Sequence, residues 1–78
     1  MTVLDSSSLI ASDPEIRDGK PCFVGTRICV HDLLEYLAGG MTEGALLADF
    51  PSLQPRHVRA ALAYAAQRAS ASSDPRPR

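Results

Sequence analysis

The chain has 78 residues, which is enough for one domain with a modest core, so a partner or self-association is expected. Its apolar fraction of 45% includes two Phe, two Tyr and no Trp, and no apolar run is long enough to span a membrane. The net charge of −1 excludes a strongly basic protein, so any nucleic-acid binding must come from a local patch.

The N-terminal segment 1–8 is polar and Ser-rich, and we expect it to be flexible. It lacks the basic and apolar parts of a secretory signal, which favours a cytoplasmic location. A single domain is expected over residues 9–68. The small, polar and proline-interrupted segment 69–78 predicts a disordered tail.

Residues 22–30 predict a β-hairpin. Two short apolar runs, 22–24 and 28–30, flank Gly25-Thr26, which has the composition of a two-residue turn with Gly25 at positive φ. The short run 9–11 is then expected to add a third strand. Strand alternation divides the hairpin between a core face with Phe23, Ile28 and Val30 and a partly exposed face with Cys22, Val24, Arg27 and Cys29.

After the hairpin the apolar period changes to that of helices. The spacing of Leu33, Leu34 and Leu37 predicts a first helix that ends at Gly39-Gly40. Thr42 is a suitable N-cap for a second helix, which should end near residues 49–51.

The third predicted helix begins at Pro55 and runs to about Ser70. It is rich in Ala, which favours helix formation intrinsically. Its expected buried face consists of Val58, Ala61, Leu62 and Ala65.

The fold class expected from these elements is α+β, mainly α, with a small N-terminal β-hairpin or sheet followed by a three-helix, helix-turn-helix-like bundle. The tight 50–54 connection gives the last two helices the outline of that motif. The later helix of such a motif contacts bases with its N-terminal residues, which here are Arg56, His57 and Arg59. The alternative interpretation is a solvated helix face that carries two Arg.

The sequence resembles a family of short bacterial and archaeal proteins that is catalogued as a domain of unknown function and related to helix-turn-helix proteins. The resemblance covers roughly residues 9–66 and is carried most specifically by Gly19-Lys20-Pro21-Cys22 and Gly25-Thr26-Arg27-Ile28. It implies a dimeric antitoxin of a type II toxin–antitoxin pair, which neutralises a PIN-like ribonuclease toxin and regulates its own operator. Two alternatives stay open: a protein-interaction module without DNA binding, and a stand-alone transcription regulator.

Gly19-Lys20 is not the end of a phosphate loop, because Pro14 stands where such a loop needs Gly and no Ser or Thr follows Lys20. We therefore interpret Lys20, Gly25, Thr26 and Arg27 as a structural or partner-binding motif, with Lys20 either solvated or touching a phosphate. Arg27 has two interpretations. It pairs with a carboxylate such as Glu15 or Glu35, or it contacts a partner or a DNA phosphate.

The remaining reactive residues predict no metal, no cofactor and no catalytic site. Cys22, Cys29, His31 and His57 match no zinc-binding spacing, and the carboxylates fall on predicted exposed helix faces. Across the hairpin, Cys22 and Cys29 would lie within reach of a disulfide, whereas a reducing cytoplasm favours free thiols. In the tail, Arg76 and Arg78 either order on a toxin surface or belong to an unstructured end.

Overall fold

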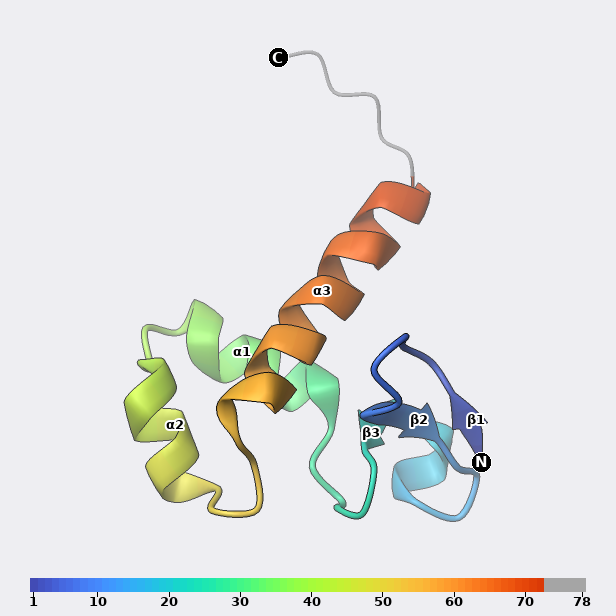
Figure 1. Cartoon of the computed structure of the whole chain (residues 1–78), viewed down its shortest axis with the longest axis horizontal. Helices are drawn as coiled ribbons and strands as arrows, with labels where there is room; N and C mark the ends of the chain where they lie inside the picture. Colours follow the sequence, from blue (N-terminus) through green and yellow to red (C-terminus); the bar gives the residue numbers. More distant parts are fainter. Residues whose placement is uncertain (73–78) are drawn as a thin grey trace.

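In the computed structural model, which describes residues 1–72, a small antiparallel sheet is followed by three helices, so the α+β fold is as predicted (Figure 1). Helix α3 lies between the sheet on one side and α1 and α2 on the other, and its C-terminal half extends beyond the rest of the fold. The elements are β1 (Thr2–Val3), β2 (Ile10–Ser12), a short turn η1 (Arg17–Gly19), β3 (Cys22–Phe23), α1 (Val30–Ala38), α2 (Glu43–Asp49) and α3 (Pro55–Ser72).

The three strands are hydrogen-bonded in the order β1-β2-β3. The third strand expected from the 9–11 run is confirmed as β2, in which Ile10 pairs with Phe23 of β3. Strand β1 was not predicted, because Thr2 and Val3 lie in a polar context. The turn that joins β1 to β2 is held by Asp5, whose carboxylate accepts a hydrogen bond from the Ile10 N–H at 2.8 Å.

The predicted hairpin is correct in its pairing but wrong in its turn. Cys22 pairs with Cys29 in an antiparallel bridge, and the Phe23 N–H donates to the Ile28 carbonyl at 3.0 Å. The tight turn, however, lies one residue earlier, because the Thr26 N–H donates to the Phe23 carbonyl at 3.0 Å. Gly25, with φ of 84°, thus occupies the third position of the turn, where a positive φ is required.

Two further expectations for the hairpin are corrected. Val30 belongs to α1 and not to a second strand, since its N–H donates to the Pro21 carbonyl at the point where the helix begins. Cys22 and Cys29 were expected on a partly exposed face, but both are buried. The face that carries Cys22 is lined by residues that precede η1. Ala11 and Ile16 line a small pocket there together with Cys22.

The helix boundaries follow the predicted capping residues. Helix α1 ends before Gly39, and the Thr42 hydroxyl accepts a hydrogen bond from the Ala45 N–H at 3.1 Å to cap α2. Helix α3 begins at Pro55 and continues to Ser72, into the segment 69–78 that was expected to be tail. The rest of that segment, with Arg76 and Arg78, lies outside the described residues.

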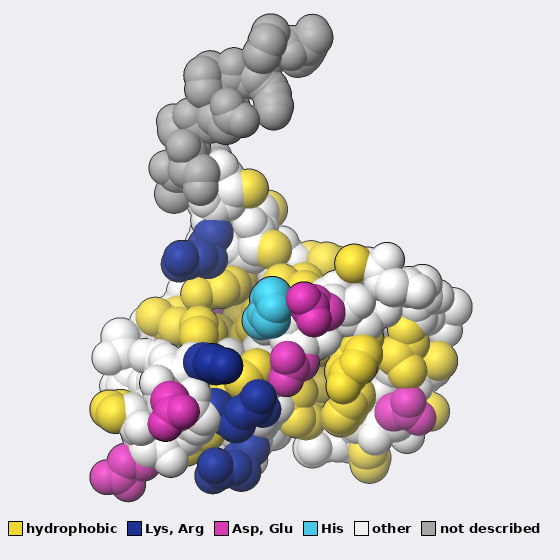
Figure 2. All heavy atoms as spheres, turned by 180° about the vertical axis from the view of Figure 1, so that it is seen from behind, with side chains coloured by type: hydrophobic (Ala, Val, Ile, Leu, Met, Phe, Trp, Pro, Cys, Tyr) yellow, Lys and Arg dark blue, Asp and Glu magenta, His cyan; other side chains and the backbone are white. Residues whose placement is uncertain are grey.

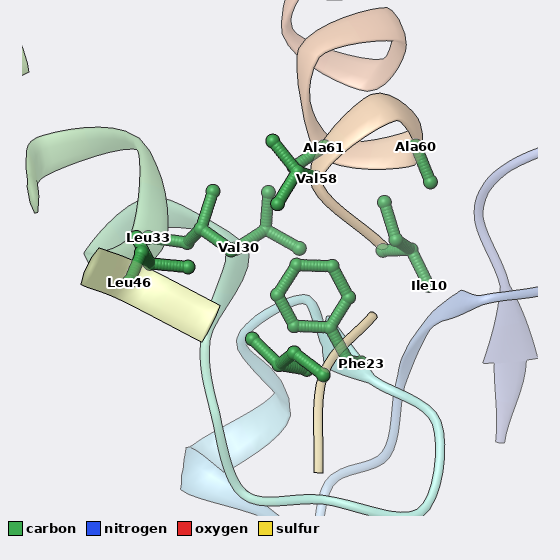
Figure 3. Close-up of a cluster of buried hydrophobic side chains, with 9 residues drawn as sticks. Ile10, Phe23, Val30, Leu33, Leu46, Val58, Ala60 and Ala61 are labelled. Atoms are coloured by element: carbon green, nitrogen blue, oxygen red, sulfur yellow. The ribbon is translucent and has the colours of Figure 1, made fainter. Parts of the chain in front are cut away.

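The core is built around the Phe23 side chain, which is fully buried (Figure 3). Its ring lies between Ile10 of β2 and Val30 of α1, below Val58 of α3. The buried cluster joins the sheet to all three helices and contains Ile10, Phe23, Val30, Leu33, Leu46, Leu53, Val58, Ala60 and Ala61.

Helix α3 is rotated slightly from the predicted orientation. Val58 and Ala61 are buried as expected, but Leu62 is 50% exposed and Ala60 is buried instead. The reason is that His57 is also buried, so the inner face of the helix is centred nearer to residue 57. Its ring meets the Phe23 ring edge-on, with centroids 5.5 Å apart and planes at 88°.

Burial, and secondarily the charge of Arg56, lowers the pKa of His57. The neutral imidazole is therefore the form that the folded state prefers. Its Nδ1 accepts the Gln54 N–H at 2.9 Å, which requires the unprotonated nitrogen.

We predict that Phe23→Ala lowers the free energy of unfolding by about 3–5 kcal/mol, because it leaves a cavity where the sheet and helices meet. The neighbouring Val24 is 40% exposed and provides a control, since Val24→Ala is expected to cost about 0.5 kcal/mol or less. Urea denaturation followed by circular dichroism measures both. Equal shifts in the two variants would contradict the central position of Phe23.

We also predict that stability falls as the pH drops below about 6.5, the ordinary pKa of histidine, because the unfolded chain then binds a proton that folded His57 resists. The variant His57→Asn keeps an acceptor for the Gln54 N–H but has no group that titrates there. Denaturation at about pH 7.5 and about pH 5.5 should show a larger loss for the native chain than for the variant. An equal loss in both would assign the pH dependence to other groups.

Candidate nucleic-acid interface

The beginning of α3 is fixed by a reciprocal pair of hydrogen bonds between Gln54 and His57. The His57 N–H donates to the Gln54 carbonyl at 2.8 Å, and the Gln54 N–H donates to Nδ1 of His57 at 2.9 Å. The second bond is one half of a capping box, with the His57 side chain in the place of the usual Glu or Gln, whereas the first bond goes to the backbone carbonyl of Gln54 and not to its side chain. Pro55 at the first helical position has no N–H to satisfy.

This cap decides which side chains of the first turns face solvent. His57 points inward to Phe23, and the two flanking Arg56 and Arg59 are exposed. Residues three apart on a helix lie on neighbouring turns of one face, so these guanidinium groups belong to the same surface. Of the three predicted DNA-contacting residues, the structure therefore brings Arg56 and Arg59 together and places His57 in the core.

Arg56 and Arg59 line a pocket of about 450 Å³ between α3 and the turn that joins β1 to β2. The α3 side of the pocket also includes Ala63, as expected from the helical spacing. Guanidinium donors in such a position can bind the oxygens of a phosphate in two parallel hydrogen bonds.

The opposite wall of the pocket carries the carboxylate of Asp5. Burial acts to raise its pKa, but hydrogen bonds from the Ser7 hydroxyl and the Ile10 and Leu9 backbone hold the pKa below its ordinary value. This carboxylate is engaged by its own turn, with the Ile10 N–H at 2.8 Å and the Ser7 hydroxyl as donors. Because the Asp5 carboxylate is already bonded within its own turn, the positive charge at the pocket is that of Arg56 and Arg59 of α3.

The Gly-Lys-Pro to Gly-Thr-Arg motif forms a tightly bonded loop. The Thr26 hydroxyl donates to the Phe23 carbonyl at 2.9 Å and accepts from the Ile28 N–H at 3.0 Å. Together with the positive φ of Gly25, these bonds define the turn. Lys20 and Arg27 are exposed at its two ends.

The basic residue that pairs with a carboxylate beside this loop is Arg17, and its partner is Asp32 rather than Glu15 or Glu35. Its guanidinium donates to the Arg27 carbonyl at 3.0 Å and lies 3.5 Å from the Asp32 carboxylate of α1. It thereby connects η1, the loop and α1. Arg17 and Asp18 both have positive φ, at 52° and 57°, which is unusual for residues other than Gly. Sequence reasoning missed this role, and the adjoining Gly19 is the only local signal of a left-handed turn.

On the side of the molecule seen in Figure 2, Lys and Arg side chains gather near the sheet. Lys20 and Arg27 are exposed and lie beside the partly buried Arg17, whose carbonyl accepts from the Lys20 N–H and whose guanidinium donates to the Arg27 carbonyl. This second basic surface is separate in sequence from the α3 pair, and it provides a matched comparison for it.

The four residues considered as a zinc set do not converge. His31 is exposed on α1 and lies 3.1 Å from the Glu35 carboxylate, whereas His57 is in the core beside Phe23. Within residues 1–72, no three His, Cys, Asp or Glu side chains are grouped as metal ligands would be. In the same part of the chain, no helix combines the length and apolar character needed to cross a membrane.

Comparison with known proteins gives one family and one relative. The family described as "Protein of unknown function (DUF433)" matches residues 10–65. An uncharacterized protein, y4eO of Sinorhizobium fredii (strain NBRC 101917 / NGR234), is 35% identical over 57 residues, which is 73% of this chain and 26% of the relative. The chain thus spans about a quarter of the length of that relative. No solved structure matches significantly. Because the matched region covers β2, β3, α1, α2 and the first part of α3, the chain belongs to the DUF433 family of proteins of unknown function.

Proposed function

We propose that this chain is a dimeric, non-enzymatic antitoxin that binds operator DNA in the cytoplasm through the first turns of α3 and neutralises a PIN-like ribonuclease toxin. The observation that carries the DNA-binding part is the exposure of Arg56 and Arg59 on one face at the start of α3. The antitoxin part rests on the resemblance given by the Gly-Lys-Pro and Gly-Thr-Arg motifs.

The relation between α2 and α3 supports this proposal. Residues 50–54 connect the two helices, and the second helix of a helix-turn-helix motif presents its N-terminal residues to the major groove. Leu46 of α2, Leu53 of the connection and Val58 of α3 are all buried in the shared core. The two helices are therefore held as one rigid unit, as groove binding requires.

The charge distribution of α3 also favours a polyanion. The helix contains three Arg and no Asp or Glu. The partial positive charge at a helix N-terminus adds to the attraction for phosphate. With a net charge of −1, attraction of DNA has to come from a local concentration of basic residues such as this one.

We predict that the double charge reversal Arg56→Glu/Arg59→Glu weakens binding to the promoter DNA of the chain's own gene by about a hundredfold or more at low salt. The dependence of log Kd on log salt should become shallower by about 2, because two phosphate contacts are lost. Fluorescence anisotropy over a salt series measures both quantities.

The matched control is Lys20→Glu/Arg27→Glu, which changes the net charge equally at the second basic surface. It should retain most of the affinity. If this control loses as much affinity as the α3 variant, DNA binding does not depend on α3. If the native chain does not bind the DNA at low salt, the DNA-binding proposal is wrong and the protein-interaction alternative is favoured.

A second candidate function, toxin masking without DNA binding, is favoured by an apolar groove of about 400 Å³ between α1 and α3. Its walls include Leu34 of α1 and Tyr64 and Ala65 of α3. Figure 2 shows hydrophobic side chains gathered where α3 leaves the body of the fold. A groove of this kind can accept apolar side chains of a partner.

We predict that Ala65→Arg abolishes neutralisation of a toxin encoded beside the chain, because it fills the groove with a charged side chain. Ala66→Arg places the same residue at the next, exposed position of α3 and should leave neutralisation intact. Co-expression with the adjacent PIN-like gene and growth measurement provide the readout. Full neutralisation by Ala65→Arg would exclude the groove, and failure of the native chain to neutralise would exclude the antitoxin function.

A further inference from the structure

Cys22 and Cys29 form a contact that the proposed functions do not use. The Sγ atoms lie 3.5 Å apart without a bond between them, and both cysteines are free and buried. Cys22 belongs to β3, and Cys29 immediately precedes α1. Two thiols held this close across paired backbone segments differ from a single buried cysteine, which packs as a small apolar residue.

The backbone around the pair brings the side chains together. The Phe23 N–H donates to the Ile28 carbonyl, and the Val30 N–H donates to the Pro21 carbonyl, both at 3.0 Å. These bonds flank the Cys22–Cys29 bridge on either side, which makes it a non-hydrogen-bonded antiparallel pair. In such pairs the Cα atoms approach to about 4.5 Å, which is within the range that a disulfide can span.

We propose that Cys22 and Cys29 are a redox modification site, in which a small peroxide oxidises the two thiols reversibly to an intramolecular disulfide. The two thiols release two protons and two electrons and form the S–S bond. The O–O bond of hydrogen peroxide breaks, and the oxygens take up those protons and electrons to leave as two water molecules. A dithiol reductant reverses the reaction by thiol–disulfide exchange.

The surroundings of Cys22 select for a small oxidant. Its side chain lines a pocket of about 20 Å³ together with Ala11, Ile16 and Thr26. Such a volume admits a molecule about the size of water but not a bulky disulfide such as oxidised glutathione. The reaction should therefore distinguish peroxide from glutathione disulfide.

Burial, together with the neighbouring Cys29 thiol, raises the pKa of Cys22 to about 11, and the charges of Arg17 and Arg27 act in the opposite direction. The protonated thiol reacts slowly with oxidants, since the thiolate is the nucleophile. Oxidation of Cys22 at neutral pH should therefore be slow and require accumulated peroxide.

Formation of the bond would connect β3 directly to the start of α1, across the loop that contains Gly25 and Thr26. A crosslink across a short loop removes freedom from the unfolded chain, so oxidation should raise the Tm by several degrees. The α3 surface with Arg56 and Arg59 lies outside this loop, so the Arg56→Glu/Arg59→Glu variant should oxidise in the same way.

The test is intact-mass spectrometry of the reduced full chain after treatment with hydrogen peroxide. We expect the loss of the mass of two hydrogen atoms in the monomer, the loss of both maleimide-reactive thiols on denaturation, and their recovery with dithiothreitol. Oxidised glutathione should react much more slowly. Two unchanged thiols, added oxygen atoms on one cysteine, or mainly intermolecular dimers would overturn the proposal.

The variant Cys29→Ser provides the control for the stabilising effect. Peroxide should raise the Tm of the native chain but not that of Cys29→Ser. An equal rise in both would show that the effect does not come from the disulfide. The mass measurement on the native chain remains decisive if the variant does not fold.

Discussion

The fold depends on the contact between the Phe23 ring of β3 and the His57 ring of α3. Phe23 is held in the sheet by its pairing with Ile10 and by the hydrogen bond to the Ile28 carbonyl. His57 is held at the start of α3 by its bonds with Gln54. The edge-on contact of the two rings therefore joins the N-terminal sheet to the last helix and sets the rotation of that helix. A chain of this length buries few large side chains, so a single central ring has a large effect.

This constraint connects the core to the proposed function. Because His57 is committed to capping and burial, Arg56 and Arg59 on either side of it must face outward. Sheet residues that never approach DNA would then position the residues that contact it. Cys22 belongs to the same sheet and pairs with Cys29 just before α1, so the proposed oxidation acts on the support of α3 rather than on its exposed face. The exposed Arg56 and Arg59 are thus proposed to bind DNA, whereas the buried Cys22 and Cys29 are proposed to respond to peroxide.

Much of the fold was predictable because its signals are local. The caps at Thr42 and Pro55, the glycines after α1 and the apolar spacing of the helices decide their boundaries within a few residues. The turn lies one residue earlier than predicted and is held by the bond of the Thr26 hydroxyl to the Phe23 carbonyl, a local contact that the spacing of apolar residues does not reveal. The inward orientation of His57 and the role of Arg17 were also missed. Both residues are polar, and their places depend on contacts that only the folded chain forms: His57 with the Phe23 ring, and Arg17 with the Arg27 carbonyl and the Asp32 carboxylate.

The central claim is that the core presents the start of α3 as the DNA-binding surface. The most direct measurement is an NMR titration of the ¹⁵N-labelled chain with promoter duplex DNA at low salt. The account predicts that the largest shifts occur at the amides of residues 55–60 and at the guanidinium groups of Arg56 and Arg59. Shifts confined to the loop between Lys20 and Ile28, or no shifts under these conditions, would contradict it.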